Sequence, residues 1–313
     1  MAQYIARRLL LLPVVLLGVS ILVFLVLQLV PGNPAQVIAG SDAPPETVKA
    51  IERELGLDRP LPEQYARYLG NVLRGDLGRS LRSKRPVLDD VMDALPNTLQ
   101  LTLAAAIITP LIAIPLGVLA AARRGSPVDS ALMLGSMLGI TAPVFAIALA
   151  LMWVFGYQLR VFPISGYGGP IWTPSGLRSV ALPALTLAVG AVATMARLTR
   201  SAMLEVLGQD YVRTARAKGL REWVVLLRHG LNNALLPIIT VIGLQVAYLL
   251  SGAVVTETIF AWPGIGRLAV YAIQSRDFPV VQGTVLVISL TFVLVNLIVD
   301  ILYAFIDPRI HYG

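Results

Sequence analysis

The chain has 313 residues, of which 56% are hydrophobic and only 14% charged, and its mean hydropathy is +0.75. A water-soluble domain of this length does not carry so apolar a composition, so most of the chain is expected to lie in lipid. The net charge of +7 does not indicate nucleic-acid binding, because the basic residues stand in short clusters beside apolar runs, which is typical of membrane proteins. The absence of cysteine excludes disulfides, thiolate nucleophiles and cysteine metal sites.

Six apolar runs of the sequence are long enough to cross a bilayer, which takes about 20 helical residues. The first, residues 9–30, follows Arg7 and Arg8. A cleaved signal peptide is the alternative for this run, but its apolar core would have only about 7 to 15 residues. The predicted fold is therefore an all-α membrane protein with six transmembrane helices. The later runs cover residues 97–122, 132–159, 180–196, 231–256 and 280–306.

Lysine and arginine in the short connections predict the orientation of the spans, because these residues accumulate on the cytoplasmic side. With the N-terminus inside, the inner side holds twelve such residues and the short outer loops hold only four. Residues 31–96 form a segment too long to contribute to this comparison. Both termini are therefore expected to be cytoplasmic.

The outer segment after the first span carries two helical patterns. Pro45 opens the first pattern, in which Val48 and Leu55 share a face and Gly56 can act as a C-cap. In the second, apolar residues recur at three- and four-residue spacing over residues 61–72. We expect these patterns to form a helical extracytoplasmic cap, which either stabilises the bundle or contacts a partner or solute.

The chain is expected to divide into two parts. Residues 1–94 hold the first span and the cap, and residues 95–306 hold the other five transmembrane helices. Within the second part, the connection over residues 163–183 is rich in glycine and proline and is predicted to be irregular. Pro143 inside the third predicted span is expected to bend its helix, with packing as the favoured reason.

A short cytoplasmic helix is predicted at residues 211–219, between the fourth and fifth spans. Asp210 can cap its N-terminus and Gly219 can end it, while Arg216 and Lys218 complement the helix dipole in the last turn. Small side chains in the middle would let another surface approach the backbone closely, which indicates a docking element. Its candidate contact residues are Asp210, Tyr211, Arg213, Thr214, Ala215, Arg216, Ala217, Lys218, Gly219 and Leu220.

This segment resembles the coupling helix of the inner-membrane permeases of binding-protein-dependent ABC importers, which carries an E-A-A-x-x-x-G signature. With the signature glycine aligned on Gly219, Arg-Thr-Ala at residues 213–215 stands in place of E-A-A, so the acidic residue is missing. Residues 210–219, followed by Asn233-Ala234-x-x-Pro237, are similar to the dipeptide, oligopeptide and glutathione subgroup, which has the MetI-like transmembrane fold. Further similar segments are Pro31-Gly32-x-Pro34, residues 55–60 and 75–80, Phe260-x-Trp262-Pro263-Gly264-x-Gly266-x-Leu268, and residues 300–309.

The resemblance implies a permease subunit of an ATP-driven importer, which forms half of a translocation pathway for short peptides in the bacterial inner membrane. It also implies a second permease subunit, two cytoplasmic ATPases that bind ATP and Mg, and an external solute-binding protein. The sequence has no G-x-x-x-x-G-K-[ST] phosphate loop, so we expect no enzymatic activity and no cofactor in this chain itself. Closure of the ATPases would move residues 211–219 and tilt the spans, in an alternating-access mechanism.

Polar residues in the last two predicted spans are candidates to line the pathway, although hydrogen bonds between helices explain such residues at least as often. These residues are Gln245, Tyr248, Ser251 and Thr256 in the fifth span and Asn296 in the sixth. Two acidic residues also lie in these spans. A carboxylate inside a membrane marks a functional site by default. Asp300 lies near the inner end of its span, where pairing with a basic loop residue is the favoured explanation, and for Glu257 the alternative to a functional role is solvation at a helix end.

Three other functions are compatible with parts of this pattern. A permease for nickel or another metal chelate has a similar appearance, and a membrane scaffold or receptor would not need the docking helix. An intramembrane enzyme would need a nucleophile with a base, or metal ligands, at membrane depth. The two histidines, His229 and His311, lie far apart at the cytoplasmic margin, where a solvated role is expected.

Overall fold

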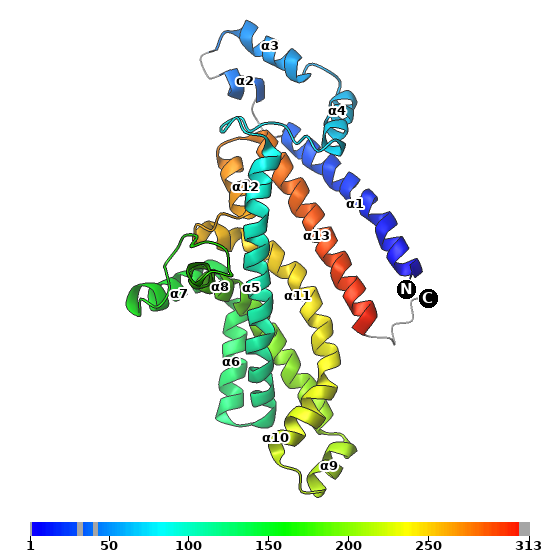
Figure 1. Ribbon diagram of the computed structural model, residues 1–313, viewed down its shortest axis with the longest axis vertical. Helices are drawn as coiled ribbons and strands as arrows, with labels where there is room; N and C mark the ends of the chain where they lie inside the picture. Colours follow the sequence, from blue (N-terminus) through cyan, green and yellow to red (C-terminus); the bar gives the residue numbers. More distant parts are fainter. Residues whose placement is uncertain (1, 30–33, 40–42, 307–313) are drawn as a thin grey trace. The chain divides into compact units, whose positions relative to one another are not determined.

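The computed structural model describes residues 2–29, 34–39 and 43–306, and the described chain is helical with no named strand (Figure 1). Residue 30 of the first predicted span, Pro31-Gly32, residues 307–309 and His311 lie outside these ranges. The elements are α1 Ala2–Leu29, α2 Pro34–Ala39, α3 Pro45–Leu55, α4 Leu61–Leu73, α5 Val87–Ala122, α6 Pro127–Thr141, α7 Val144–Leu151, η1 Met152–Gln158, α8 Pro174–Leu207, α9 Asp210–Ala217, α10 Glu222–Val224, η2 Val225–Leu231, α11 Asn232–Ile259, α12 Ile265–Gln274 and α13 Phe278–Ile306, where η marks a π-helix.

Two compact units make up the chain. The first comprises Met1–Asn97 and Pro263–Leu294, and the second comprises Thr98–Trp262 and Val295–Gly313. These units group residues that pack against each other. The predicted boundary at residue 94 instead separates residues by their expected position in the membrane, and it stays a prediction.

In the first unit, α4 packs against α1 through aromatic side chains. The ring of Phe24 makes an edge contact with Tyr65 and stacks on Tyr68, and the hydroxyl groups of Tyr65 and Ser20 are 2.8 Å apart. Burial, followed by the neighbouring Tyr65, raises the pKa of Tyr68 to about 12, so its hydroxyl stays protonated at neutral pH. Gly56 ends α3 with a φ of +70°, as the sequence predicted. The predicted helical patterns thus form α3 and α4, while their place outside the membrane stays a prediction.

The core of the first unit lies where α5, α12 and α13 meet. Val87, Val91, Ala94, Ile265, Ala272 and Val280 form one buried cluster. A Cβ added at Gly283 would lie 2.5 Å from Val87 Cγ1, so the absence of a side chain at Gly283 lets α13 approach α5 closely. Ile265 and Ala272 of α12 belong to the same cluster as Val87 and Val91, so α12 packs against the start of α5.

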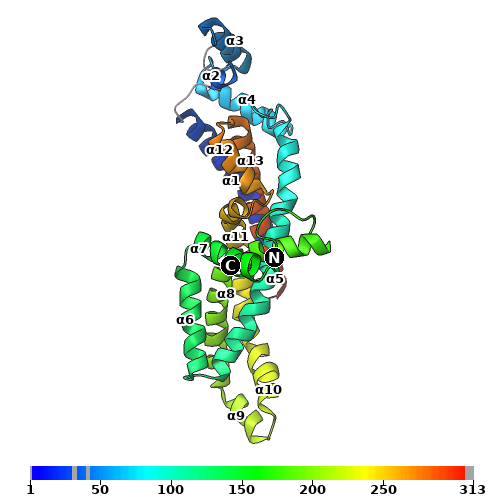
Figure 2. The same ribbon diagram turned by 90° about the vertical axis from the view of Figure 1, so that its left-hand side faces the viewer.

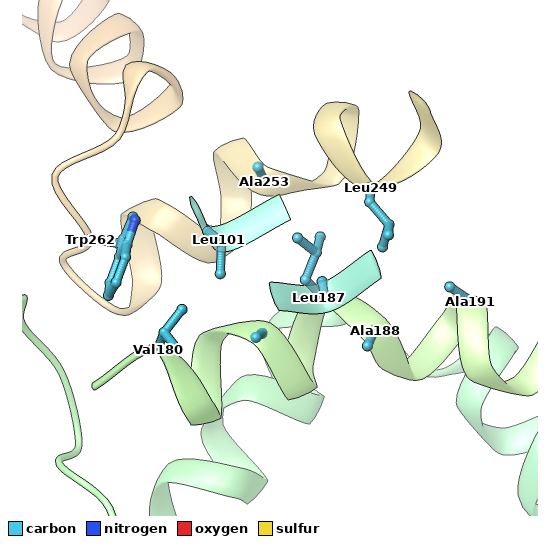
Figure 3. Packing of buried hydrophobic residues seen from close by; sticks show 10 residues of the cluster. Leu101, Val180, Leu187, Ala188, Ala191, Leu249, Ala253 and Trp262 are labelled. Atoms are coloured by element: carbon cyan, nitrogen blue, oxygen red, sulfur yellow. The ribbon is translucent and has the colours of Figure 1, made fainter. Parts of the chain in front are cut away.

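In the second unit, α8 is the central helix, and 67% of its apolar window is buried. Its small residues Ala184, Ala188 and Ala191 pack with Leu101 of α5 and Leu249 of α11 in one buried cluster (Figure 3). Short side chains let helices approach closely, which is how helices associate in a solvent as apolar as their own side chains.

At the other end of α8, a polar contact joins it to α6. Asp129 accepts hydrogen bonds from Arg200 Nε at 2.6 Å and Nη2 at 2.7 Å, and also from the backbone N–H of Gly125 at 3.0 Å. The Asp129 side chain is only 6% exposed. Figure 2 shows α6 running beside α8, with α9 and α10 at the end of the second unit that α8 leads into. The ion pair therefore fixes α6 to the part of α8 nearest α9.

Within the described residues, four single helices are long and apolar enough to cross a membrane, and one bent pair brings the number to five. The single helices are Val87–Ala122, Pro174–Leu207, Pro237–Ile259 and Phe278–Val299. The described apolar part of α1, Leu10–Leu25, is shorter. The chain is thus a multi-pass, all-α membrane protein, whereas the six-span count and the cytoplasmic termini stay predictions.

The third predicted span, residues 132–159, is not one straight helix. The pair Pro127–Thr141 and Val144–Gln158 is bent by 113°. Pro143 disfavours the helical conformation for the residue before it, and Ala142 is extended with a ψ of 131°. Pro143 then precedes α7 as its N-cap, so proline ends one helix and starts the next.

The connection predicted to be irregular up to residue 183 ends earlier, because α8 begins at Pro174. The Thr173 hydroxyl accepts a hydrogen bond from the N–H of Gly176 at 3.0 Å, and Pro174 occupies the first helical turn. Threonine at the N-cap followed by proline is a strong signal for the start of a helix. The prediction overlooked this signal because the surrounding segment is rich in glycine and proline. Pro183 lies inside the helix.

The substitution Asp129→Asn tests the contact between α6 and α8. It removes the charge that two guanidinium hydrogen bonds need, and we expect the free energy of unfolding to fall by about 2 kcal/mol. The measurement is thermal unfolding of the full chain in detergent. Glu63→Gln serves as the control, because its partner Arg59 forms an exposed ion pair worth less than about 1 kcal/mol. Equal melting temperatures for the two variants would contradict this assignment.

Candidate functional site

The predicted docking helix exists as α9, with ends close to those expected. Gln209 is its N-cap, and Asp210 is the first helical residue, so the prediction that Asp210 caps the helix is wrong. With its side chain 96% exposed, Asp210 lies near the positive end of the helix dipole and accepts a 3.4 Å hydrogen bond from Arg213. Gly219 follows the C-cap Lys218 with a φ of +77°, which confirms the predicted end.

One face of α9 is buried against the rest of the second unit. Val212 and Ala215, three residues apart on the helix, pack with Val225 of η2 and with Leu207 at the end of α8. Val212 was not among the predicted residues of this segment, although a large aliphatic residue in an otherwise polar helix is a usable signal of a buried face. Ala215, which was also predicted to belong to the docking surface, is buried beneath the exposed face, and its part in any contact with an ATPase stays a prediction.

Polar contacts hold the segment around α9 together. Arg216 donates to the two carboxylate oxygens of Glu222 at 2.7 Å and 3.2 Å, and the Tyr211 hydroxyl donates to the carbonyl of His229 at 3.3 Å. The hydrogen bond from Arg216 lowers the pKa of Glu222, so this stabilisation is present above the ordinary glutamate pKa and is lost as the pH falls through the lowered value. The contact ties the end of α9 to α10.

The remaining candidate residues of α9 form an exposed face. Apart from Ala215, all of them are exposed: Asp210, Tyr211, Arg213, Thr214, Arg216, Ala217, Lys218, Gly219 and Leu220. Thr214 turns its hydroxyl onto the carbonyl of Asp210 at 3.0 Å, so it presents mainly its methyl group. The helix therefore offers a small, largely basic exposed surface. Beneath it lies the buried apolar cluster of Val212, Ala215, Val225 and Leu207, called the apolar seat of α9 below. The contact of α9 with an ATPase stays a prediction.

The candidate pathway residues of α11 divide between two environments. Leu244, Tyr248, Ser251 and Val255 recur at helical spacing along one exposed face, with Tyr248 67% exposed. Thr256 is buried and bonds back to the carbonyl of Gly252 at 3.5 Å, so it does not belong to this face.

The other two polar candidates are partly buried. Gln245 lies next to the exposed face of α11, and Asn296 lies in α13. Their roles in a pathway stay predictions.

The structure tests the prediction for only one of the two acidic residues in the last spans. Glu257 is fully buried and accepts a 2.5 Å hydrogen bond from the hydroxyl of Thr98, so the alternative of solvation at a helix end is wrong, while a functional role stays a prediction. The contact joins α11 to α5 within the second unit. Asp300 lies in α13, and its pairing with a basic loop residue stays a prediction.

Over the described part of the chain, no group of three or more metal-ligating side chains is close enough to hold a metal ion.

Sequence comparison places this architecture in a transport family. Residues 113–312 match the family described as binding-protein-dependent transport system inner membrane component, and residues 1–102 match its N-terminal family. These matches and the apolar helices define an integral membrane component of a transport system. The chain belongs to the binding-protein-dependent transport system inner membrane component family.

Full-length relatives lie within this family. The chain is 42% identical over 333 aligned positions to the dipeptide transport system permease protein DppB of Alkalihalophilus pseudofirmus, with both chains fully covered. It is 43% identical to the glutathione transport system permease protein GsiC of Salmonella paratyphi A and 42% identical to that of Escherichia coli, again with full coverage of both.

The substitution Val212→Ala tests the apolar seat of α9. It removes two buried methyl groups, worth about 1.5 kcal/mol, so local opening of residues 210–220 should become about tenfold more frequent. Amide hydrogen exchange of the full chain in detergent measures this change. Tyr211→Phe is the control, because it removes only one exposed hydrogen bond and should leave exchange close to that of the unaltered chain. Unchanged exchange in Val212→Ala would show that α9 is held by its polar contacts instead.

Proposed function

We propose that this chain is the permease subunit of an ATP-driven importer in the bacterial inner membrane, and that it forms half of the translocation pathway for short peptides. The observation that carries the proposal is the full-length identity of about 42% to permeases named for dipeptides and glutathione. Those names favour a peptide over a metal chelate as the cargo. A membrane scaffold is disfavoured because α9 presents an exposed face on a defined seat.

The proposed complex contains a second permease subunit, two cytoplasmic ATPases and an external solute-binding protein. ATP and Mg would bind in the ATPases, and this chain would bind neither. In this arrangement α9 and α10 face the cytoplasm, whereas α3, α4 and α12 lie on the outer side. The excess of basic residues on the α9 side supports that orientation.

The contacts of α9 support a role in transmitting force. A partner that pushes on α9 also displaces Leu207 at the end of α8 and Val225 of η2, because all three elements share one buried cluster. Through Arg200 and Asp129 the same displacement reaches α6. Tightly packed helices move as rigid bodies, so a shift of α9 becomes a tilt of the helices that enclose the pathway.

The substitution Ala217→Trp tests docking of the ATPases on α9. Ala217 is the last helical residue and is exposed, so tryptophan blocks close approach without disturbing the buried seat. We expect less ATPase to co-purify with the complex, and peptide uptake into proteoliposomes to fall at least tenfold, because lost docking contacts of about 1.4 kcal/mol correspond to a factor of ten.

The matched control is Ala50→Trp, which adds the same bulk to an exposed position of α3. It should leave co-purification of the ATPases unchanged, because α3 lies on the side of the membrane opposite to them in the proposed arrangement. Purification of the unaltered chain without any ATPase, or full coupling in Ala217→Trp, would contradict the proposed function. Uptake of a labelled nickel chelate but of no dipeptide would reassign the cargo.

A further inference from the structure

The first unit contains a cavity of about 720 Å³, which is within the usual range of about 300–1,000 Å³ for small-molecule sites. One wall is a face of α5 with Asp90, Asp93 and Asn97 at three- and four-residue spacing. The facing wall is a face of α12 that carries Arg267 and Tyr271. Opposite charges therefore stand on facing helices of one unit.

The base of the cavity is apolar and rigid. Ala94, Leu268, Ala272 and Val280 line it, and they also belong to or pack against the buried core of the first unit. A site with an apolar base and a few charged groups around it suits a small molecule that carries both charges and hydrocarbon.

The third side of the cavity is a turn over residues 80–85 that Asp277 holds in place. The buried Asp277 carboxylate accepts hydrogen bonds from the Ser80 hydroxyl at 2.6 Å and from the backbone N–H of Leu81 at 3.1 Å. These bonds fix the direction in which Arg82 and Arg85 leave the turn. The charge of Asp277 is thus used to hold the turn, and the lining also contains three arginines and two aspartates.

The ion pair between Arg85 and Asp93 is easy to exchange, whereas Asp90, the other partner of Arg85, is only 14% exposed. Arg85 lies 2.9 Å from Asp90 and 3.0 Å from Asp93, and the side chains of Arg85 and Asp93 are 53% and 69% exposed. An exposed ion pair contributes little to stability, so a ligand ammonium group can replace Arg85 beside Asp93 at little cost. On the opposite wall, the guanidinium of Arg267 is suited to a carboxylate.

We infer that this cavity receives a short peptide, with the peptide carboxylate on Arg267 and its ammonium group on Asp93. The inference rests on the proposed function, which places α12 on the outer side, and it adds a site that recognises both ends of the cargo. Exchange of exposed ion pairs gives weak binding, and weak binding is what a transport site needs if the solute is to leave again.

A double comparison tests the contact with the carboxylate. Complexes in proteoliposomes receive saturating loaded binding protein, and uptake of a dipeptide is compared with uptake of its C-terminal amide. Arg267→Gln should lower uptake of the dipeptide about tenfold, the equivalent of about 1.4 kcal/mol, while uptake of the amide is the same in both proteins. Arg267→Lys should restore part of the uptake, because it keeps the charge and loses the planar fork.

The matched control for charge loss is Arg74→Gln, at an exposed position of the first unit outside the cavity. It should transport both peptides as the unaltered complex does. Equal loss for dipeptide and amide in Arg267→Gln would show a structural role and overturn the inference. If the unaltered complex transports neither peptide, the proposed function itself fails, so the two failures are distinguishable.

Photo-crosslinking identifies what enters the cavity. A benzophenone amino acid replaces Tyr271, which is 62% exposed in the cavity wall, and Tyr157, which is 61% exposed outside it, provides the control. Labelling of a radioactive dipeptide from position 271 and not from position 157 is expected. Crosslinks from position 271 to the second permease or to the binding protein alone would show that a protein segment fills the cavity, and would overturn the inference.

Discussion

Close backbone approach around α8 is the constraint on which the second unit depends. Three neighbouring helices each bring a glycine to it, namely Gly117 from α5, Gly139 from α6 and Gly252 from α11. A Cβ at Gly117 would lie 2.5 Å from the Cβ of Thr199, and one at Gly252 would lie 3.0 Å from Leu187. Lipid offers no hydrophobic gain for helix association, so this fit of glycine against α8 supplies the attraction.

A helix held in this way on three sides can transmit displacement. The end of α8 shares a buried cluster with Val212 and Ala215 of α9, and its Arg200 is bonded twice to Asp129 of α6. A movement that begins at α9 therefore has an apolar and a polar connection into the helices of the unit. The exposed face of α9 can change with the partner that it meets, whereas its buried face has to preserve the fit.

The first unit combines an apolar core with charged groups that stay accessible. Its core residues are contributed by α5, α12 and α13, and the same elements carry Asp93 and Arg267 on the cavity side. Asp277 fixes a turn instead of facing a ligand, because its oxygens are occupied by the Ser80 hydroxyl and by backbone N–H groups. The physical requirements of the two units thus differ: close helix fit in the second, and exchangeable charge on a rigid base in the first.

The sequence by itself determined the features that depend on neighbouring residues. Apolar runs identify the long helices, and Gly56 and Gly219 end α3 and α9 with positive φ angles, because glycine adopts that conformation without steric cost. The family resemblance on the docking segment was readable for the same reason, since its spacing lies within a short stretch of chain.

Only the tertiary structure decided which side chains are buried and what they meet. Glu257 is enclosed because Thr98, far away in the sequence, lies beside it, and Ala215 faces inward because Val225 folds back onto α9. The cavity likewise needs α5 and α12 to face each other, although well over a hundred residues separate them. Helix ends follow from local backbone preferences, whereas burial and charge pairing follow from contacts between distant segments that no single stretch of sequence contains.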